Sequence, residues 1–407
     1  MTRRRLVAVT MSATYPPRRG NQIRTASLLS SLGPEWAIAS YSLTLQRTDL
    51  PLPHRVHPVS ERWTDYRSRD PFATTWAAAL GKLGKPPVHV GRILRAWPHG
   101  PLLRALTQAD VVLVSPPYHF AWVRRHTPAS IPVVFDEHSI EAHLYSGSSS
   151  WWARTIEREV ERCERNALQE ADLVFVTSEE DGANVRAWGA RRTALVPNGV
   201  DAGRFHPASA ERKAALRREL GLPPDGVLGV FVGSGHPPNV EAVGCIEHEA
   251  AEYRKAGVGV VVVGRCGAGR APVPGVIHTG EVPDVVPYLQ AADIALCPLL
   301  TGSGTSLKTL EYLAAGLPLV STDVGIRGLG LRPGDDVVIS TPSDMPARAA
   351  HLAADPAEMA NLSAAGRSAV VGRFGWDAVG RAATAALDTL VGSPGSADSS
   401  TRSEQKE

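Results

Sequence analysis

The chain has 407 residues, 43% of them apolar, which is enough for two or three domains with separate cores and excludes disordered and fibrous classes. Lysine and arginine total 43 against 41 acidic residues, so the net charge of +2 provides no field that would attract a nucleic acid. The four cysteines lie far apart without a Cys-x-x-Cys pair, as is typical of proteins in the reducing cytosol. We therefore expect a cytoplasmic protein with no nucleic-acid partner.

The N-terminus is basic and then apolar, like the start of a signal peptide. Its apolar run stops at Val9, and no small-residue cleavage site follows before Pro16 and Pro17. We interpret this run as the first strand. No stretch approaches about 20 uncharged apolar residues, so no membrane span is expected.

Short β-branched runs alternate with amphipathic segments, a pattern typical of parallel sheets covered by helices on both faces. Strands are predicted at 6–9, 36–41, 111–114, 133–135, 173–176 and 193–196, and then at 227–232, 258–263, 276–278, 294–297, 319–321 and 337–339. Between the two series, residues 197–225 are rich in turn formers around one charged helix over 211–220. The predicted fold class is α/β, with two Rossmann-like, doubly wound domains.

The predicted domains cover residues 1–200 and 201–373. A helix over 374–392 is expected to pack back toward the N-terminal domain, and residues 393–407 form a polar tail expected to be disordered. The stretch 82–104 is basic and contains no acidic residue. Two interpretations of it stay open, a peripheral contact with the inner face of an anionic membrane and a solvated basic face.

A glycine-rich loop follows the predicted strand at 294–297. Gly302 and Gly304 allow a ligand to approach the backbone, and Thr305 or Ser306 is predicted to cap the helix that begins near residue 307. The N–H groups of the first helical turn then form an anion site suited to a diphosphate.

Two charged residues on the same helix add to this loop. Lys308 provides a cation one turn in, and the Glu311 carboxylate can accept two hydrogen bonds from hydroxyl groups such as those of a ribose. An ordinary strand–turn–helix connection would explain the glycines but not Lys308 and Glu311 together.

Residues 297–322 resemble the nucleotide-binding segment of the family 4 glycosyltransferases, which have the GT-B fold of two Rossmann-like domains facing across a cleft. Further segments resemble the family in the same order, at 15–24, 135–145, 171–181, 196–205, 231–243 and 279–299. The resemblance implies transfer of a sugar from a UDP- or GDP-sugar to an acceptor, with retention of configuration, in glycan or natural-product biosynthesis. It also implies a reaction without a metal or other cofactor, and the sequence has neither an Asp-x-Asp nor a His-Glu-x-x-His motif. The acceptor is expected to be a small molecule or a lipid-linked glycan.

The resemblance also implies roles for individual residues. Glu311 would hold the donor ribose, Gly304, Thr305 and Lys308 its phosphates, and His138 would lie near the transferred sugar. The residues predicted to contact the donor are Gly20, Arg24, Gly233, Ser234, Arg265, Gly302, Ser303, Gly304, Thr305, Ser306, Lys308 and Glu311, and those predicted to act in catalysis are His138, Lys308 and Glu311. Asp136 and Glu137 are candidates for binding an acceptor, with a capping role as the alternative. Asn198 and Gly199 are expected to have a hinge or structural role.

Three positions depart from the family pattern. Ser303 stands where many members have the first of two glutamates, Gly233 to His236 where many have an Arg and a Lys, and Ser306 where close relatives have an Arg. Arg265 is the predicted substitute for the missing phosphate-binding cation. Three alternatives stay open: a nonhydrolysing sugar-nucleotide epimerase, a catalytically silent nucleotide-binding homologue, and an oxidoreductase suggested by the glycines of residues 264–269, whose spacing is not that of a dinucleotide site.

Overall fold

The computed structural model describes residues 3–17, 20–43, 56–67, 100–138, 151–302 and 304–392. Its contacts divide the chain into an N-terminal unit, Met1–Pro197 with Val379–Glu407, and a C-terminal unit, Asn198–Ala378. The predicted basic stretch up to residue 99, Ser303 and the predicted tail lie outside the described residues.

The N-terminal unit contains an eight-stranded sheet in the order β3-β4-β2-β1-β5-β6-β7-β8. Its strands are β1 Arg4–Thr10, β2 Trp36–Ser42, β3 Val56–Ser60, β4 Trp63–Arg67, β5 Val111–Ser115, β6 Val133–Asp136, β7 Leu173–Val176 and β8 Thr193–Leu195. All neighbouring pairs are parallel except β3 with β4. The central strands are short β-branched runs buried on both faces, with Val9, Val112 and Phe135 fully buried, because helices cover both sides.

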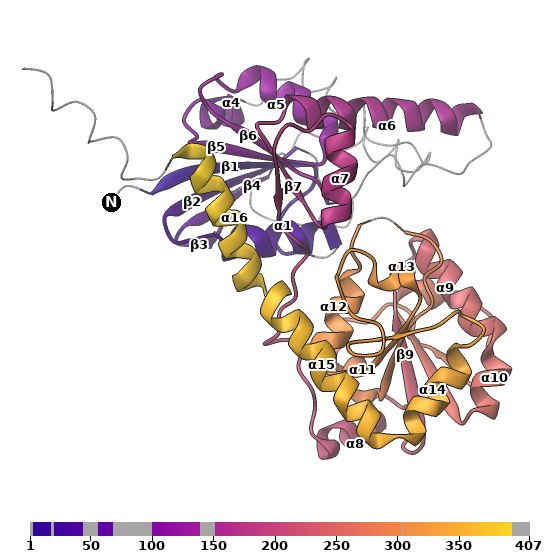
Figure 1. Ribbon diagram of the computed structural model, residues 1–407. Coiled ribbons are helices and arrows are strands. Elements are labelled where there is room, and N and C mark those ends of the chain that lie inside the picture. The colour runs from indigo at the N-terminus through magenta and orange to yellow at the C-terminus, as the bar shows by residue number, and fades with distance from the viewer. Residues whose placement is uncertain are drawn as a thin grey trace, which may run out of the picture. The chain divides into compact units, whose positions relative to one another are not determined.

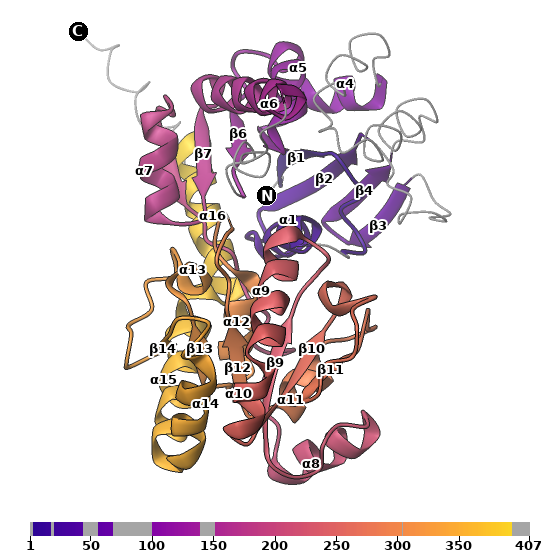
Figure 2. The ribbon, with the colours of Figure 1, turned by 90° about the vertical axis from the view of Figure 1, so that its right-hand side faces the viewer.

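The helices of this unit flank the sheet, with α1 on one side and α4, α5 and α6 on the other (Figures 1 and 2). They are α1 Gly20–Ser31, α4 Gly100–Leu106, α5 Phe120–His126, α6 Trp151–Glu170, α7 Glu179–Ala187 and α16 Trp376–Val391, with a short 3-10 turn, η3, at Pro117–His119. Local sequence sets their starts, as at Ser178, whose side chain accepts a hydrogen bond from the N–H of Asp181 and caps α7.

The C-terminal unit contains a six-stranded, wholly parallel sheet in the order β11-β10-β9-β12-β13-β14, which can be followed in Figure 2. The strands are β9 Val227–Val232, β10 Val258–Val263, β11 Val276–His278, β12 Ile294–Cys297, β13 Leu319–Ser321 and β14 Val338–Ile339. The helices are α8 Ala210–Glu219, α9 Pro237–His248, α10 Ala250–Lys255, α11 Val286–Ala291, α12 Leu307–Ala314, α13 Asp323–Ile326, α14 Met345–Ala354 and α15 Pro356–Phe374, with a 3-10 turn, η5, at Arg265–Gly267. Two α/β units with mainly parallel sheets confirm the predicted fold class.

The strands β3 and β4 form a hairpin that the sequence analysis missed. β3 lies at the sheet edge, contains Pro58 and has alternately exposed residues, so it lacks the continuous β-branched run of the other strands. Its partner β4 places Trp63 and Asp65 in the interior, where Ser40 links them by accepting from the Trp63 ring N–H and donating to the Asp65 carboxylate.

The C-terminal part of α16 belongs to the N-terminal unit and contacts α1 and β1. The N–H of Gly33 donates to Thr384 Oγ1 at 2.9 Å, and Arg4 forms an ion pair with Asp388 at 2.7 Å. Gly380 lies so close to α1 that an added Cβ would be 2.1 Å from the carbonyl oxygen of Ser31. Only a glycine fits at this helix crossing.

Replacing Gly380 with alanine is expected to lower the free energy of unfolding by about 1–3 kcal/mol, because the Cβ meets backbone that must shift to accommodate it. Gly372 in α15 is the matched control, since a Cβ there meets no atom within 4 Å. Its replacement by alanine is expected to stabilise the protein by about 0.5–1 kcal/mol through helix propensity. Urea unfolding of both variants measures the difference, and effects of the same sign would contradict the packing described.

Candidate functional site

Each sheet has a point at which the strand order reverses, so that successive strands extend toward one edge of the sheet and later strands toward the other. In the N-terminal sheet β1 lies between β2 and β5, and in the C-terminal sheet β9 lies between β10 and β12. In open parallel sheets, ligands bind at the carboxyl ends of strands near such points. The described residues of the predicted site lie in loops and on helices that follow the carboxyl ends of strands, one group in each unit.

In the C-terminal unit, the loop after β9 is held close to β10. A Cβ on Gly233 would lie 2.9 Å from Cys266 Sγ and from the Cβ of Asn239. Asn239 Nδ2 donates to the backbone and side-chain oxygens of Ser234, at 3.2 Å each, and Asn239 Oδ1 accepts from Lys308 Nζ at 2.7 Å. The sequence analysis missed Asn239, which connects this loop to the predicted phosphate-binding lysine.

The glycine-rich loop after β12 has a backbone conformation that requires glycine at two positions. Gly302 and Gly304 have φ of +150° and +66°, a region that favours glycine. Arg327, after α13, donates from Nη1 to the carbonyl oxygen of Gly302 and from Nη2 to that of Gly304, both at 2.9 Å. Arg327 was also missed, because only the folded chain brings it to this loop. Thr305 is fixed by Asn198, whose Nδ2 donates to Thr305 Oγ1 at 2.7 Å.

Helix α12 starts immediately after this loop, with Ser306 at the N-cap position. The prediction that a hydroxyl at 305 or 306 caps the helix is wrong, because neither side chain bonds the first turn: Thr305 is held by Asn198, and Ser306 Oγ makes no cap bond. In the described part of the chain, Ser306 Oγ is buried without a hydrogen-bond partner. The N–H groups of the first turn have no acceptor within the helix either. The Ser306 hydroxyl and the N–H groups of the first turn are thus hydrogen-bond donors that lie together at the start of α12.

Lys308 and Glu311 lie one turn apart on α12, both partly buried. Burial lowers the pKa of Lys308, whose Nζ lies 5.5 Å from the centre of the Phe231 ring. Burial raises the pKa of Glu311 to about 7, although the positive charges of Arg204 and Lys308 oppose the rise. No hydrogen bond or ion pair from any described residue reaches the Glu311 carboxylate. A partly buried carboxylate without a partner can accept bonds from the hydroxyl groups of a ligand.

Arg265, the predicted substitute cation, follows β10 beside the loop after β9, since a Cβ on Gly235 would lie 3.9 Å from the Arg265 Cβ. Its side chain is 52% exposed and its Nε lies 3.9 Å from Glu281. Among the described residues, no hydrogen bond joins it to Lys308 or to the glycine-rich loop.

In the N-terminal unit, Arg24, which is predicted to contact the donor, lies in the interior. Its Nη2 donates to Asp136 Oδ1 at 2.7 Å and to the carbonyl oxygen of Val196 at 2.9 Å, and its side chain is 1% exposed. Asp136, one of the two candidates for binding an acceptor, is also buried. Gly20, the first residue of α1, is exposed.

His138 follows β6 at the carboxyl edge of the N-terminal sheet. Its Nε2 lies 2.7 Å from Asp136 Oδ2 and 3.2 Å from Ser115 Oγ, and its side chain is 18% exposed. It lines a small pocket of about 50 Å³ together with polar residues from the ends of β1 and β5 and the start of α1. The rest of the lining is Thr10, Met11, Ser12, Thr14, Asn21, Gln22, Thr25, Ser115 and Pro116.

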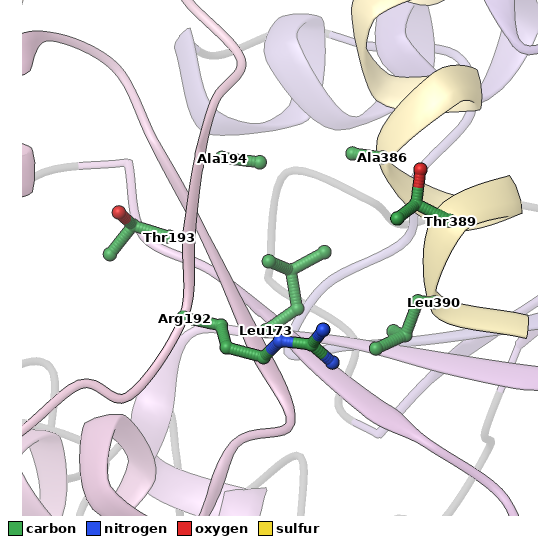
Figure 3. Close-up of a pocket in the computed structure, with 7 residues that line it drawn as sticks. All are labelled: Leu173, Arg192, Thr193, Ala194, Ala386, Thr389 and Leu390. Carbon is green, nitrogen blue, oxygen red and sulfur yellow. The ribbon is translucent and has the colours of Figure 1, made fainter.

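A larger pocket, of about 350 Å³, lies at the opposite ends of the strands in the same unit, where β7 and β8 begin beside the end of α16 (Figure 3). It is lined by Leu173, Arg192, Thr193, Ala194, Ala386, Thr389 and Leu390. It contains none of the predicted site residues and lies at the amino ends of the strands, so it is not the candidate site.

Within the described ranges, no group of three or more His, Cys, Asp or Glu side chains is arranged to hold a metal ion. Among the helices described, none combines the length and the apolar character that crossing a membrane requires.

Two protein-family models match this chain. Residues 38–204 match the model of Glycosyltransferase Family 4, and residues 227–355 match that of Glycosyl transferases group 1. The two matches together extend over more than half of the chain. The protein therefore belongs to the family 4 glycosyltransferases, as the resemblance in the sequence indicates.

Among curated proteins, the chain is 31% identical over 245 residues to a D-inositol 3-phosphate glycosyltransferase of Streptomyces bingchenggensis, covering 54% of this chain and 52% of the relative. It is 30% identical over 202 residues to the putative teichuronic acid biosynthesis glycosyltransferase TuaC of Bacillus subtilis, covering 48% of each. The chain thus spans about half the length of the curated relatives it matches.

Among solved structures, the fold is similar to that of sucrose-phosphate synthase from Thermosynechococcus elongatus, with a TM-score of 0.70 and 21% identity over 95% of this chain and 99% of the other. It is also similar to Anabaena HepE in complex with UDP-glucose, with a TM-score of 0.65 and 14% identity over 94% and 99%. These similarities confirm the GT-B fold class.

Proposed function

We propose that the protein transfers a sugar from a nucleotide-diphosphate sugar to a hydroxyl group of an acceptor, and that the C-terminal unit binds the nucleotide. The observation that carries this proposal is the set of unsatisfied groups around the start of α12. Ser306 Oγ and the Glu311 carboxylate have no partner among the described residues, and Lys308 lies between them in the helix. Hydrogen-bond donors and a cation suit a diphosphate, and a carboxylate beside them can accept hydrogen bonds from the hydroxyl groups of the attached ribose.

In the proposed reaction, the bond between the anomeric carbon and the diphosphate oxygen breaks, and its electron pair leaves on the diphosphate. The acceptor oxygen bonds to the same carbon and gives its proton to an oxygen of the leaving diphosphate. The α12 N–H groups and Lys308 stabilise the negative charge that develops on the leaving diphosphate. Donors and a cation at the diphosphate can take the place of a metal ion, so we propose a metal-independent reaction. Retention of configuration is proposed because the sequence resemblance implies it. His138 is proposed to contact a substrate hydroxyl.

UDP-sugars are the first donors to test, because the structurally similar HepE was solved with UDP-glucose. The acceptor is proposed to be a hydroxylated small molecule or a lipid-linked glycan, as the sequence resemblance implies.

A thermal-shift panel of UDP, GDP, dTDP, ADP and NAD(H), each with and without Mg²⁺, tests the proposal. A ligand at about 100 times its Kd stabilises the protein by about 2.7 kcal/mol, which raises the melting temperature by several degrees. We expect one nucleoside diphosphate to do so equally with and without Mg²⁺, and Lys308→Met to lose most of the shift. Lys255→Met is the control, because Lys255 is exposed on α10 and paired with Glu252.

Turnover separates the alternatives. Release of the nucleoside diphosphate only when an acceptor is added supports transfer, whereas conversion of a UDP-sugar to its epimer without acceptor supports an epimerase. Stabilisation by NAD(H) alone would overturn the proposal, and tight nucleotide binding without any turnover would indicate a silent homologue.

A further inference from the structure

Three side chains form a line from the interior of the N-terminal unit to the small pocket at the end of β1 and β5. Arg24 of α1 donates to one oxygen of Asp136, and the other oxygen of Asp136 lies 2.7 Å from Nε2 of His138. The side chains of Arg24 and Asp136 are 1% and 0% exposed, whereas that of His138 is 18% exposed and lines the pocket. Only the last member of the line can touch a ligand there.

The chemistry of these groups fixes where the protons lie. A guanidinium only donates hydrogen bonds and an ionised carboxylate only accepts them. Burial alone would raise the pKa of Asp136, but the charge of Arg24 and the hydrogen bonds from Arg24 and His138 outweigh burial and hold that pKa below its usual range. Asp136 is thus an acceptor on both sides, and Nε2 of His138 carries the proton between them.

The other ring nitrogen of His138 is then an acceptor. In the part of the chain that the structure describes, no hydrogen bond reaches Nδ1, since both contacts of the ring, to Asp136 and Ser115, are made by Nε2. A neutral imidazole with Nε2 protonated presents a lone pair on Nδ1.

We propose that Arg24 and Asp136 are positioning residues that hold His138 in the tautomer with the proton on Nε2, so that Nδ1 accepts a hydrogen bond from a substrate hydroxyl. The role in the reaction rests on the proposed function, but the tautomer does not. Arg24 is therefore not a donor-binding residue in this proposal. It orients Asp136, which orients the histidine.

The proposal predicts a tautomer reversal. In Asp136→Asn, Arg24 still has to donate to the side-chain oxygen, which turns the amide NH₂ toward Nε2. Nε2 must then accept, so the proton moves to Nδ1 and the pocket loses its acceptor. The same reasoning applies to catalytic triads, where an Asp-to-Asn change imposes the wrong histidine tautomer. Replacing Arg24 as well, in Arg24→Met/Asp136→Asn, frees the amide to turn over and is expected to restore the proton to Nε2.

Nitrogen-15 NMR of histidine-labelled protein at a pH where His138 is neutral tests this, with the signal of His138 identified by its absence in His138→Gln. We expect Nε2–H in the wild type, Nδ1–H in Asp136→Asn and Nε2–H in the double variant. Ser115→Ala is the control, since it removes the second contact of the same nitrogen and leaves Asp136 in place. The proposal would be overturned if His138 carried its proton on Nδ1 in the wild type, or if Asp136→Asn left the tautomer unchanged.

Activity gives the second readout. Asp136→Asn is expected to lower sugar transfer at least tenfold, with part of the loss restored in the double variant, which a purely structural role of Asp136 would not produce. Restored tautomer without any restored transfer would overturn the catalytic part. Should the wild type transfer no sugar at all, the proposed function fails while the NMR result still decides the tautomer.

Discussion

Replacing Glu311 with glutamine is expected to weaken nucleotide binding about 100-fold while making the unliganded protein more stable above pH 7. The loss of affinity follows from removing a charged acceptor of two hydroxyl bonds, for a total of about 3 kcal/mol. The gain in stability follows from the raised pKa of this carboxyl, which burial brings to about 7. Affinity and stability change in opposite directions, because a buried carboxylate without a partner stabilises the complex with the ligand and destabilises the unliganded protein.

The direction of the pH dependence can be worked out. An unfolded glutamate releases its proton near 4.5, whereas folded Glu311 keeps its proton up to about pH 7. Between these values the folded state binds more protons, so its stability is complete below pH 4.5 and falls as the pH rises to 7. The full loss is on the order of 3 kcal/mol, at about 1.4 kcal/mol for each pH unit. Glutamine does not ionise, so Glu311→Gln escapes this loss.

Urea unfolding at pH 5.5 and pH 8 measures the stability effect, and the advantage of Glu311→Gln should grow between them. Titration of the diphosphate over pH 6 to 8 measures the binding effect. Wild-type affinity should rise through pH 7 more steeply than that of the variant, because only the wild type ionises a carboxyl at the site. Glu252→Gln, at an exposed residue of α10, is the binding control. Unchanged nucleotide affinity in Glu311→Gln would remove Glu311 from the site.

Replacing Gly264 with alanine is expected to destabilise the protein by about 3 kcal/mol or more and to weaken nucleotide binding as well. Gly264 directly follows β10 with a φ of +105°, and a Cβ there would lie 2.3 Å from the carbonyl oxygen of Gly233. The left-handed backbone alone costs about 1–2 kcal/mol for alanine, and the contact with backbone adds a further 1–3 kcal/mol. The loop that must move contains Gly233 and Ser234, which Asn239 connects to Lys308.

Gly269, five residues later, separates the two contributions. It has a φ of +72°, but a Cβ there would meet no atom within 4 Å. Gly269→Ala is therefore expected to lose only the backbone contribution, about 1–2 kcal/mol, and to bind the nucleotide normally. Urea unfolding and the thermal-shift panel together measure both variants. Equal losses of stability would show that the contact with Gly233 is not decisive.

The sequence predicted the elements best where local chemistry decides. Strands β9 to β13 are short β-branched runs bounded by turn residues, and the structure has them where the pattern predicted. Helix α12 ends at Ala314, and Gly316 follows two residues later with a φ of +75°, which few other residues adopt. The β3–β4 hairpin was missed because its polar, alternating residues and Pro58 resemble a loop, and pairing with β2 places it in the sheet.

The sequence likewise predicted the parts of the candidate site that lie close together along the chain, but not the contacts that join distant parts. Glycines and charges close together in sequence identified the loop and α12, and these assignments stay predictions until tested. The partners of these residues come from elsewhere in the chain: Arg327 lies 25 residues beyond Gly302, and Asn239 lies 69 residues before Lys308. Arg24, which is predicted to contact the donor, pairs with Asp136, 112 residues away. No spacing rule indicates contacts over such separations.

The return of α16 to the N-terminal unit has a consequence for how the protein is made. Gly33 and Arg4, at the start of the chain, contact Thr384 and Asp388 near its end. The N-terminal unit leaves the ribosome first but lacks this helix until residues 376–391 have been synthesised. The C-terminal unit is continuous from Asn198 to Ala378 and is complete earlier. Domains usually fold in the order in which they are synthesised, with the N-terminal domain first. Of these two units, however, the N-terminal one is the second to be completed.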